Sequence, residues 1–298
     1  MRGIAQRLGA LLALLTLAVF VGAGCGGNDN KTTSSATETG TTTSAIQVPD
    51  AIKSKGTLVV ATDASYAPME FFAPDGKTIE GLDADFAKAI AAKLGLKADV
   101  KNVTFDAIIP GLAAHKYDVG MSSFTDTKER EQTVDFVTYF TAGTSFFTKA
   151  QGGKDITGLA DLCGVKVAVQ RGTTMADDGN AQSKKCKQEG KPGVDVQVYP
   201  TQDGANLAIV SGRAQIGFAD SPVVAYQIQK SEGKLKATGT PYAVAPFGIA
   251  IPKDSGLAEP ILEAVKATMA DGDYQKILEK WGVQDSAITS PVINGAES

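Results

Sequence analysis

Short apolar runs that resemble strands alternate with amphipathic helical patterns from residue 51 to residue 281. The first run, TLVVAT at 57–62, predicts a buried strand. The next segment predicts a helix, because Leu82, Phe86 and Ile90 recur at every fourth position. Such alternation is typical of βα units and of largely parallel sheets. We therefore expect an α/β fold.

The same helix carries signals for both of its ends. Asp83 is expected to cap its start, and Gly95 stands where a left-handed residue is favoured after a helix. Further elements follow from the same two periodicities. The predicted helices are 106–116, 173–188, 204–211, 222–230, 257–269 and 274–281. The predicted strands are 97–103, 118–121, 165–169, 194–199, 215–219 and 243–251.

The predicted units fall into two sets, at 51–145 and 155–235, and each set is too short for a large single sheet. The run APFGIAI at 245–251 predicts that the chain returns across a hinge to complete the first set. We expect one lobe from 51–145 with 242–298 and a second lobe from 146–241. Ligands of open α/β sheets bind at the carboxyl ends of the strands, so two facing lobes would enclose a ligand cleft.

The first 24 residues have the composition of a targeting segment. Arg2 and Arg7 precede a run of apolar and small residues at 8–24, which is a little short for a membrane span. The small residues before Cys25 resemble the lipobox of bacterial lipoproteins, in which the cysteine becomes the lipidated first residue. We expect export, with a cleaved signal peptide at 1–24 and a lipid on Cys25. The alternative is an ordinary secretory signal with an incidental cysteine.

Residues 25–50 form a Gly/Ser/Thr-rich tract without apolar periodicity, which cannot build a core. We expect a lipidated, flexible tether. About 25 such residues have a root-mean-square span of about 25 to 30 Å. The folded body would then stand close to the outer face of the cytoplasmic membrane.

Charge and residue counts exclude several kinds of site. The 29 Lys and Arg against 33 Asp and Glu give a formal charge of −4, so nucleic acid finds no broad basic surface. One histidine, His115, and three cysteines make a multi-ligand metal site or a Ser-His-Asp triad hard to assemble. We expect no metal, no cofactor and no nucleic-acid partner.

Cys163 and Cys186 are the only cysteines after Cys25, and an exported chain meets an oxidising environment. We expect them to pair in a disulfide. Closing a loop of about 24 residues contributes on the order of 3 kcal/mol in the chain-entropy model. The alternatives are two unpaired buried thiols, or a redox pair that lacks the usual Cys-x-x-Cys spacing.

Seven segments follow one another along the folded part of the chain. They are 61–71 (ATDASYAPMEF), 81–86 (GLDADF), 105–112 (FDAIIPGL), 117–130 (YDVGMSSFTDTKER), 164–174 (GVKVAVQRGTT), 217–220 (GFAD) and 271–282 (DGDYQKILEKWG). In this order they resemble the bacterial extracellular solute-binding proteins of family 3, which serve ABC importers of polar amino acids. The resemblance implies a two-lobed periplasmic-binding-protein fold of type II, with two crossover strands and a ligand cleft between the lobes. It also implies an amino acid and ABC permease subunits as partners of a monomeric protein.

A zwitterionic amino acid needs a cation for its carboxylate and an anion for its ammonium. A guanidinium grips a carboxylate with two parallel hydrogen bonds, which makes Arg130 the candidate cation, although by itself it reads as a solvated helix charge. Asp220 follows the apolar run 216–219 and is the candidate for the ammonium, with an N-cap as its alternative role. The resemblance adds carboxylate contacts from Ser122, Ser123, Thr125, Thr173 and Thr174.

The resemblance places Asp63, Tyr66 and Phe105 around the side chain of the ligand. Gln170 and Met175 stand where cation-binding members commonly have an apolar residue and a glutamine. Aromatic faces suit an aliphatic or cationic stem, and Asp63 supplies charge or a hydrogen bond at its far end. The residues alone also fit a turn at Asp63 and a hydrophobic staple at Phe105. We expect a long polar amino acid, with arginine, lysine or histidine preferred over glutamine.

Three classes of function share this fold: a transport binding protein, an amino-acid-sensing receptor domain and a dehydratase-like enzyme. Catalysis needs an acid or base with a tuned pKa, and Asp63, Glu70 and Asp220 have no partner motif for it. Glu70 itself fits either a rim charge or a second acid of the site, and the sequence assigns it to neither. No second apolar span and no kinase segment follows residue 282. We therefore expect a non-enzymatic, extracytoplasmic binding component that delivers a polar amino acid to a membrane permease.

Overall fold

The computed structural model describes residues 46–297, so the predicted signal peptide, Cys25 and most of the predicted tether lie outside the described residues. Ile46 and Val48, near the end of the predicted tether, pack half-buried against the hydrophobic core. Helix α1 (Asp50–Lys55) follows them. Among the described residues, no helix is both long enough and apolar enough to cross a membrane.

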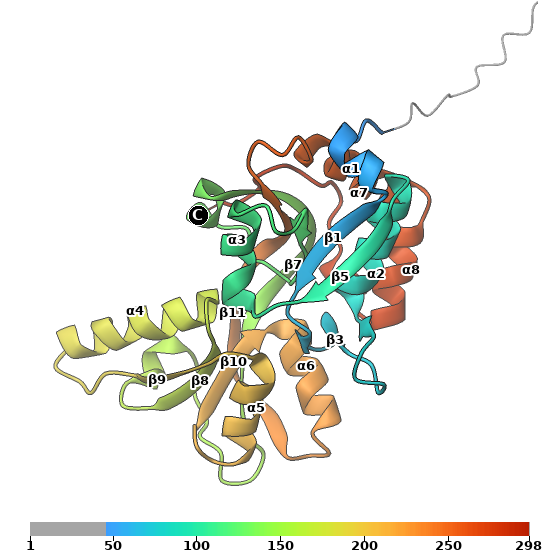
Figure 1. Ribbon diagram of the computed structural model, residues 1–298. Coiled ribbons are helices and arrows are strands. Elements are labelled where there is room, and N and C mark those ends of the chain that lie inside the picture. Colours follow the sequence, from blue (N-terminus) through green and yellow to red (C-terminus); the bar gives the residue numbers. More distant parts are fainter. Residues whose placement is uncertain (1–45, 298) are drawn as a thin grey trace, which may run out of the picture. The chain divides into compact units, whose positions relative to one another are not determined.

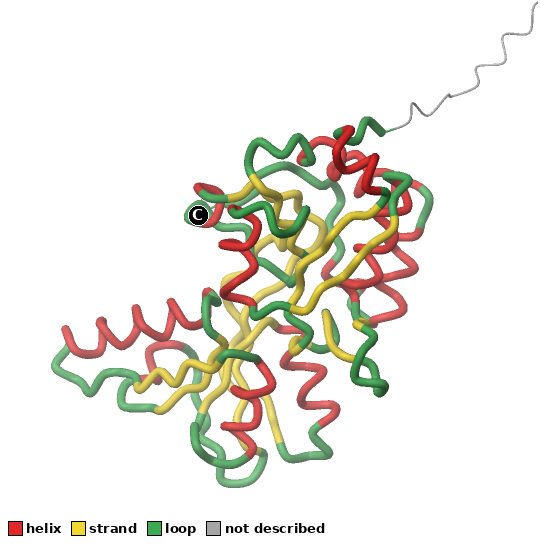
Figure 2. The backbone as a smooth tube through the Cα atoms, in the orientation of Figure 1, coloured by secondary structure: helices red, strands yellow, loops and turns green. Residues whose placement is uncertain are grey.

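Eight strands form one mixed sheet in the order β5-β1-β6-β11-β7-β10-β8-β9 (Figures 1 and 2). β1 pairs in parallel with β5 and β6, and β8 pairs in parallel with β9 and β10. These two groups of strands are the βα units that the sequence predicts. The bounds are β1 Thr57–Thr62, β5 Lys97–Asn102, β6 Val119–Gly120, β7 Val134–Lys149, β8 Lys166–Gln170, β9 Asp195–Tyr199, β10 Ile216–Asp220 and β11 Leu235–Pro252.

β7 and β11 are long antiparallel strands that connect the two groups. β11 pairs with β6 at Ala250, whereas β7 pairs with β10 along Thr144 to Phe147. They are the two crossover strands that the resemblance implies. The periodicity of the sequence predicts only the 243–251 part of β11 and no strand at β7. Most of β7 is buried on both faces, so it lacks the period-two alternation that marks a half-exposed strand.

Helices accompany both groups of strands (Figure 1). Every predicted helix forms within a few residues of its predicted ends. A separate three-stranded sheet, which sequence analysis did not predict, precedes the first long helix. With the first group lie α2 Leu82–Lys93, α3 Phe105–Ala113, α7 Ala258–Ala270 and α8 Asp273–Trp281, and with the second group α4 Thr174–Gln188, α5 Gln202–Val210 and α6 Ser221–Lys230. The small sheet consists of β2 Ser65–Tyr66, β3 Glu70–Phe72 and β4 Ile79–Glu80.

The predicted cap of α2 is wrong. Gly81, with a φ of 131°, occupies the N-cap position, and Asp83 lies inside the helix. A side chain at Gly81 would collide with the Met69 carbonyl, so only glycine fits there. The Asp83 carboxylate points into the protein instead and accepts hydrogen bonds from the Tyr139 hydroxyl at 2.6 Å and the Ser123 amide at 2.7 Å.

The predicted disulfide between Cys163 and Cys186 is confirmed, with Cα atoms 5.6 Å apart. It joins the 3₁₀ turn Leu159–Leu162 to the last turns of α4. Cys186 is fully buried in a cluster with Val167 and Phe218. The bond therefore reinforces the core of the second group of strands.

Candidate ligand-binding site

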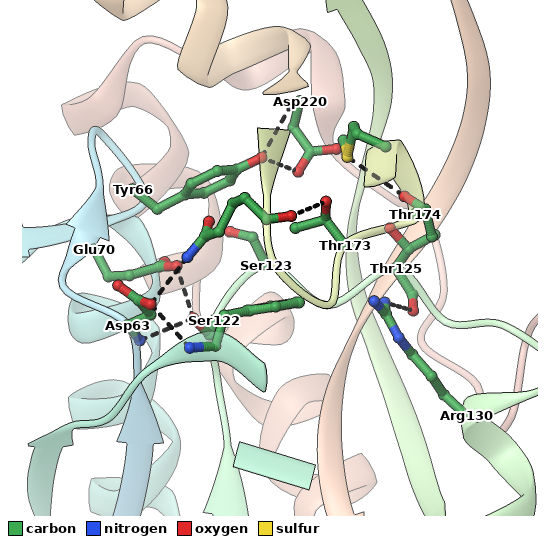
Figure 3. A pocket seen from close by; sticks show the side chains of 13 residues that line it. Asp63, Tyr66, Glu70, Ser122, Ser123, Thr125, Arg130, Thr173, Thr174 and Asp220 are labelled. Carbon is green, nitrogen blue, oxygen red and sulfur yellow. Dashed lines mark hydrogen bonds between the residues drawn. The ribbon is translucent and has the colours of Figure 1, made fainter. Parts of the chain in front are cut away.

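The carboxyl ends of β1, β6, β8 and β10 contribute to one pocket (Figure 3). This is where ligands bind in open α/β sheets. The structure brings together all the residues proposed to contact a ligand. They are Asp63, Tyr66, Phe105, Ser122, Ser123, Thr125, Arg130, Gln170, Thr173, Thr174 and Asp220, and Glu70 and Met175 complete the lining.

Arg130 spans from the first group of strands to the second. Its Nη1 donates to the Thr125 carbonyl at 2.8 Å, and its Nη2 donates to the Gly172 carbonyl at 3.0 Å. The guanidinium carbon lies 5.6 Å from the centre of the Phe105 ring and 5.4 Å from that of Phe124. Burial lowers the pKa of Arg130, and nearby carboxylates oppose this shift. A guanidinium stays charged under these conditions, so the pocket holds a fixed cation.

Asp220 ends β10 in the second group of strands. Its Oδ2 accepts a hydrogen bond from the Tyr66 hydroxyl at 2.6 Å, and its backbone N–H donates to the same hydroxyl at 3.0 Å. The residue occupies the N-cap position of α6, but its side chain makes no cap hydrogen bond. Burial raises the pKa of Asp220 to about 7, although Tyr66 and Arg130 act to lower it. An ammonium group beside this carboxyl would favour its ionised form.

Asp63 follows β1 and is bound on several sides. Its Oδ1 accepts from the Ser65 hydroxyl at 2.7 Å, and its Oδ2 accepts from the Phe105 amide at 2.9 Å. The Gln170 side-chain amide, from the second group of strands, also donates to Oδ2 at 2.9 Å. Burial raises the pKa of Asp63, and the hydrogen bond from Ser65 lowers it. The carboxylate therefore meets only neutral donors, and a cation would be a better partner.

Glu70, for which the sequence leaves a rim charge and a second acid as alternatives, lies in the pocket wall on β3 and is fully buried, which excludes the rim. Its Oε1 accepts from the Ser122 hydroxyl at 3.0 Å. Burial, followed by the charge of neighbouring Asp83, raises the pKa of Glu70 well above its ordinary value. The sequence signal for this residue is its place in the run MEFF at 69–72, where apolar neighbours predict burial. Unpaired acids are rarely buried, so an acid in such a run points to a special role.

The first turn of α4 faces the pocket. Thr173 is the N-cap residue, and its hydroxyl accepts from the Ala176 amide at 3.3 Å. Gly172 before it has a φ of 76°, and a Cβ there would lie 3.1 Å from the Cβ of Asp106. The positive φ and the short distance to Asp106 both favour glycine at this position. With glycine there, the start of α4 lies close to α3. The free N–H groups of a helix's first turn suit a carboxylate, which agrees with the role proposed for Thr173 and Thr174.

Two groups of βα units joined by two long strands, with a polar pocket at the carboxyl ends of those units, define the class of two-lobed ligand-binding proteins. The match to a family model over residues 58–284 makes the assignment more specific. The chain belongs to the bacterial extracellular solute-binding proteins, family 3.

Individual relatives are amino-acid-binding proteins. The chain is 35% identical over 249 residues to the arginine-binding protein ArgT of Corynebacterium glutamicum, which covers 83% of this chain and 81% of that protein. It is 31% identical over 283 residues to the ABC transporter glutamine-binding protein GlnH of Bacillus subtilis, with 93% and 97% covered. Among solved structures, an ancestral arginine-binding protein bound to arginine matches with a TM-score of 0.69 and 38% identity, covering 76% of this chain and 98% of that one. An ancestral arginine-binding protein bound to glutamine matches equally well.

Proposed function

We propose that this protein is the extracytoplasmic substrate-binding component of an ABC importer, which captures a polar amino acid and delivers it to a membrane permease. The observation that carries the proposal is the presence of both Arg130 and Asp220 in the lining of one pocket, each supplied by a different group of strands. A free amino acid requires this combination of a cation and an acid. Relatives that bind arginine and glutamine support the proposal.

In the proposed complex the ligand replaces hydrogen bonds that the protein makes to itself in this structure. The ligand carboxylate binds the Arg130 guanidinium, which here donates to the Gly172 carbonyl. The ligand ammonium binds the Asp220 carboxylate, which here accepts from the Tyr66 hydroxyl. The ligand thereby links both groups of strands and stabilises the closed state, which a permease can distinguish from an open one. Hydroxyls and amides of Ser122, Ser123, Thr125, Thr173 and Thr174 complete the carboxylate site.

We further propose that the ligand side chain is cationic. The pocket lining contains three carboxyl groups, on Asp63, Glu70 and Asp220, and one guanidinium, on Arg130. A zwitterion adds no net charge, whereas arginine, lysine or protonated histidine adds one positive charge. Asp63 is the proposed partner of that charge, with Tyr66, Phe105 and Gln170 along the stem.

The cell-envelope features form part of the same proposal. The signal peptide ends at residue 24, Cys25 carries the lipid, and a tether runs from there toward Ile46, where the chain packs against the core before the predicted end of the tether at residue 50. One lobe comprises 51–145 with 242–298, the other comprises 146–241, and the protein is a monomer on the outer face of the cytoplasmic membrane. Incorporation of labelled palmitate tests the anchor, and undiminished labelling of Cys25→Ser would refute it.

The proposed activity is binding without chemical change. An amino acid released from the complex by heating should have the same mass and chirality as before binding. A converted product would instead support the dehydratase-like alternative.

A thermal-shift screen of the mature protein against the common amino acids tests the function directly. A ligand at 100 times its dissociation constant adds about 2.7 kcal/mol to the free energy of unfolding. We expect the largest shifts with arginine, lysine or histidine. A rise in melting temperature with glutamine or an acidic amino acid alone would contradict the proposed cationic ligand and leave the proposed binding function standing. No rise with any amino acid would contradict both the cationic ligand and the binding function.

A further inference from the structure

We propose that Glu70 is a second acid at the side-chain end of the pocket, that it shares one proton with Asp83 in the unliganded protein, and that it releases this proton when a cationic side chain binds beside Asp63. The inference rests on the proposed function and specifies the ligand class of that site. Glu70 thereby becomes a residue that determines specificity for charged over uncharged side chains.

The hydrogen bonds assign the proton to Glu70. Glu70 and Asp83 are 0% and 1% exposed. Asp83 accepts from the Tyr139 hydroxyl, the Ser123 amide and the Ser123 hydroxyl, at 2.6, 2.7 and 3.3 Å. Glu70 accepts only from the Ser122 hydroxyl, and its Oε2 meets no donor group in residues 46–297. An ionised carboxylate without donors is costly to bury, so Asp83 carries the charge and Glu70 carries the proton.

The carboxyl groups that face Glu70 favour this state: Asp83 from α2 and Asp63 from the end of β1. The phenols of Tyr66 on β2 and Tyr139 on β7 also face it and carry no charge. Arg130 is the cation of the same pocket lining, and its guanidinium donates to the Thr125 and Gly172 carbonyls. The raised pKa of Glu70 is consistent with the assignment that the geometry makes.

Glu70 is also connected to the proposed ligand position. The Ser122 hydroxyl donates to Glu70 Oε1 and accepts from the Asp63 amide, both at 3.0 Å. Figure 3 shows the carboxyl groups of Glu70 and Asp63 at the same end of the pocket. Gln170 donates an uncharged N–H to Asp63 there. A ligand cation that replaces this amide brings a positive charge to the end of the pocket that Glu70 lines.

The positive charge favours ionised Glu70, so the O–H bond of Glu70 breaks and its proton passes to the buffer. A neutral side chain brings no such charge and leaves the proton in place. Binding of the ligand ammonium can likewise make Asp220 release its proton to the buffer, but that release is common to every amino acid. The difference between a charged and an uncharged ligand therefore isolates the protons at the side-chain end of the pocket. Burial also raises the pKa of Asp63 there, so the variant Glu70→Gln is needed to assign the proton to Glu70.

Isothermal titration calorimetry in two buffers with different ionisation enthalpies counts the released protons. The ligands are arginine and citrulline, which has an uncharged urea in place of the guanidinium. At pH 7 we expect arginine to release about one proton more than citrulline. Glu70→Gln, which keeps the shape of the side chain, should abolish this excess while the protein still binds arginine.

Equal proton release for the two ligands in the wild type would overturn the proposal, and so would an excess that persists in Glu70→Gln. If that variant does not fold, Asp63→Asn decides: excess proton release that persists in it supports Glu70 as the source, and excess release that disappears assigns the proton to Asp63 and overturns the proposal. If citrulline binds too weakly to measure, the comparison of arginine between wild type and Glu70→Gln decides. Arginine binding without excess release would refute only this inference, whereas the failure of every amino acid to bind would refute the proposed function as well.

Discussion

The two groups of strands form unequal walls of the pocket. The first wall comprises Asp63, Tyr66, Glu70, Phe105, Ser122, Ser123, Thr125 and Arg130, and the second wall comprises Gln170, Thr173, Thr174, Met175 and Asp220. In the first wall, Asp63 is bound by Ser65 and by the amide of Phe105, and both donors come from the same group of strands.

In the second wall, the Asp220 carboxylate accepts from Tyr66, and the Gln170 amide donates to Asp63. Both partners belong to the first wall. Asp63 in the first wall therefore has partners within its own wall, whereas the Asp220 and Gln170 side chains of the second wall find their partners across the pocket. We expect the first wall to hold the ligand in the open state and the second wall to respond to it.

The disulfide is the strongest test of whether the second wall needs separate support. Replacing Cys163 and Cys186 by serine should lower the free energy of unfolding by about 3 kcal/mol, because the unfolded chain loses a closed loop. Urea titration of the wild type and the double variant measures this. Ligand affinity of the folded variant should be unchanged, since neither cysteine lines the pocket. A changed affinity at unchanged stability would contradict the prediction.

Arg130→Ala and Asp220→Ala test the two walls against each other. Each should cost at least about 2 kcal/mol of binding to any amino acid, because each leaves one ligand charge desolvated and unpaired. Calorimetry measures the loss, and circular dichroism checks that the fold is kept. Arg171→Ala is the matched control, since Arg171 is half exposed, pairs with Asp106 at 3.7 Å and lies outside the pocket lining. Wild-type affinity in either test variant would exclude that residue from the site.

Asp63→Asn tests the side-chain end of the first wall. Asparagine keeps an acceptor for neighbouring donors but removes the charge, so arginine should lose about 1 to 2 kcal/mol more binding free energy than glutamine. Competition of both amino acids against a labelled ligand provides the measurement. Equal losses of binding free energy for arginine and glutamine would show that Asp63 does not distinguish a charged ligand side chain from an uncharged one.

Asp220→Asn separates stability from binding in the second wall. The pKa of Asp220 is about 7 in the folded protein, against 3.8 as the ordinary value. Between these values the folded state binds a proton that the unfolded state has released, so this residue's contribution to stability falls as pH rises through that window. The unliganded variant should therefore become more stable than the wild type by at least about 1 kcal/mol above pH 7, with no such gain at pH 4. Thermal unfolding at both pH values checks this, and a gain independent of pH would refute it.

Local pattern and the recognisable order of motifs account for much of the organisation seen here. The βα units, the helices and the Cys163–Cys186 pair follow from periodicity and cysteine usage. The residues gathered at the pocket were also foreseeable, because Asp63, Gln170 and Asp220 stand at or just after the carboxyl ends of strands. In a sheet of this type those ends converge on one edge. Their contacts with a ligand remain predictions.

Other features depend on packing between distant parts of the chain. β7 carries no readable period because both of its faces are buried. Asp83 stands at a position where the sequence predicts a helix cap, yet its carboxylate is a buried acceptor for the Tyr139 hydroxyl, 56 residues away. The hydrogen bond between Gln170 and Asp63 joins residues 107 positions apart. Burial and long-range partners decide the ionisation of Glu70 and Asp220, and no local pattern encodes them, because only the assembled fold removes water from these groups and sets their neighbours.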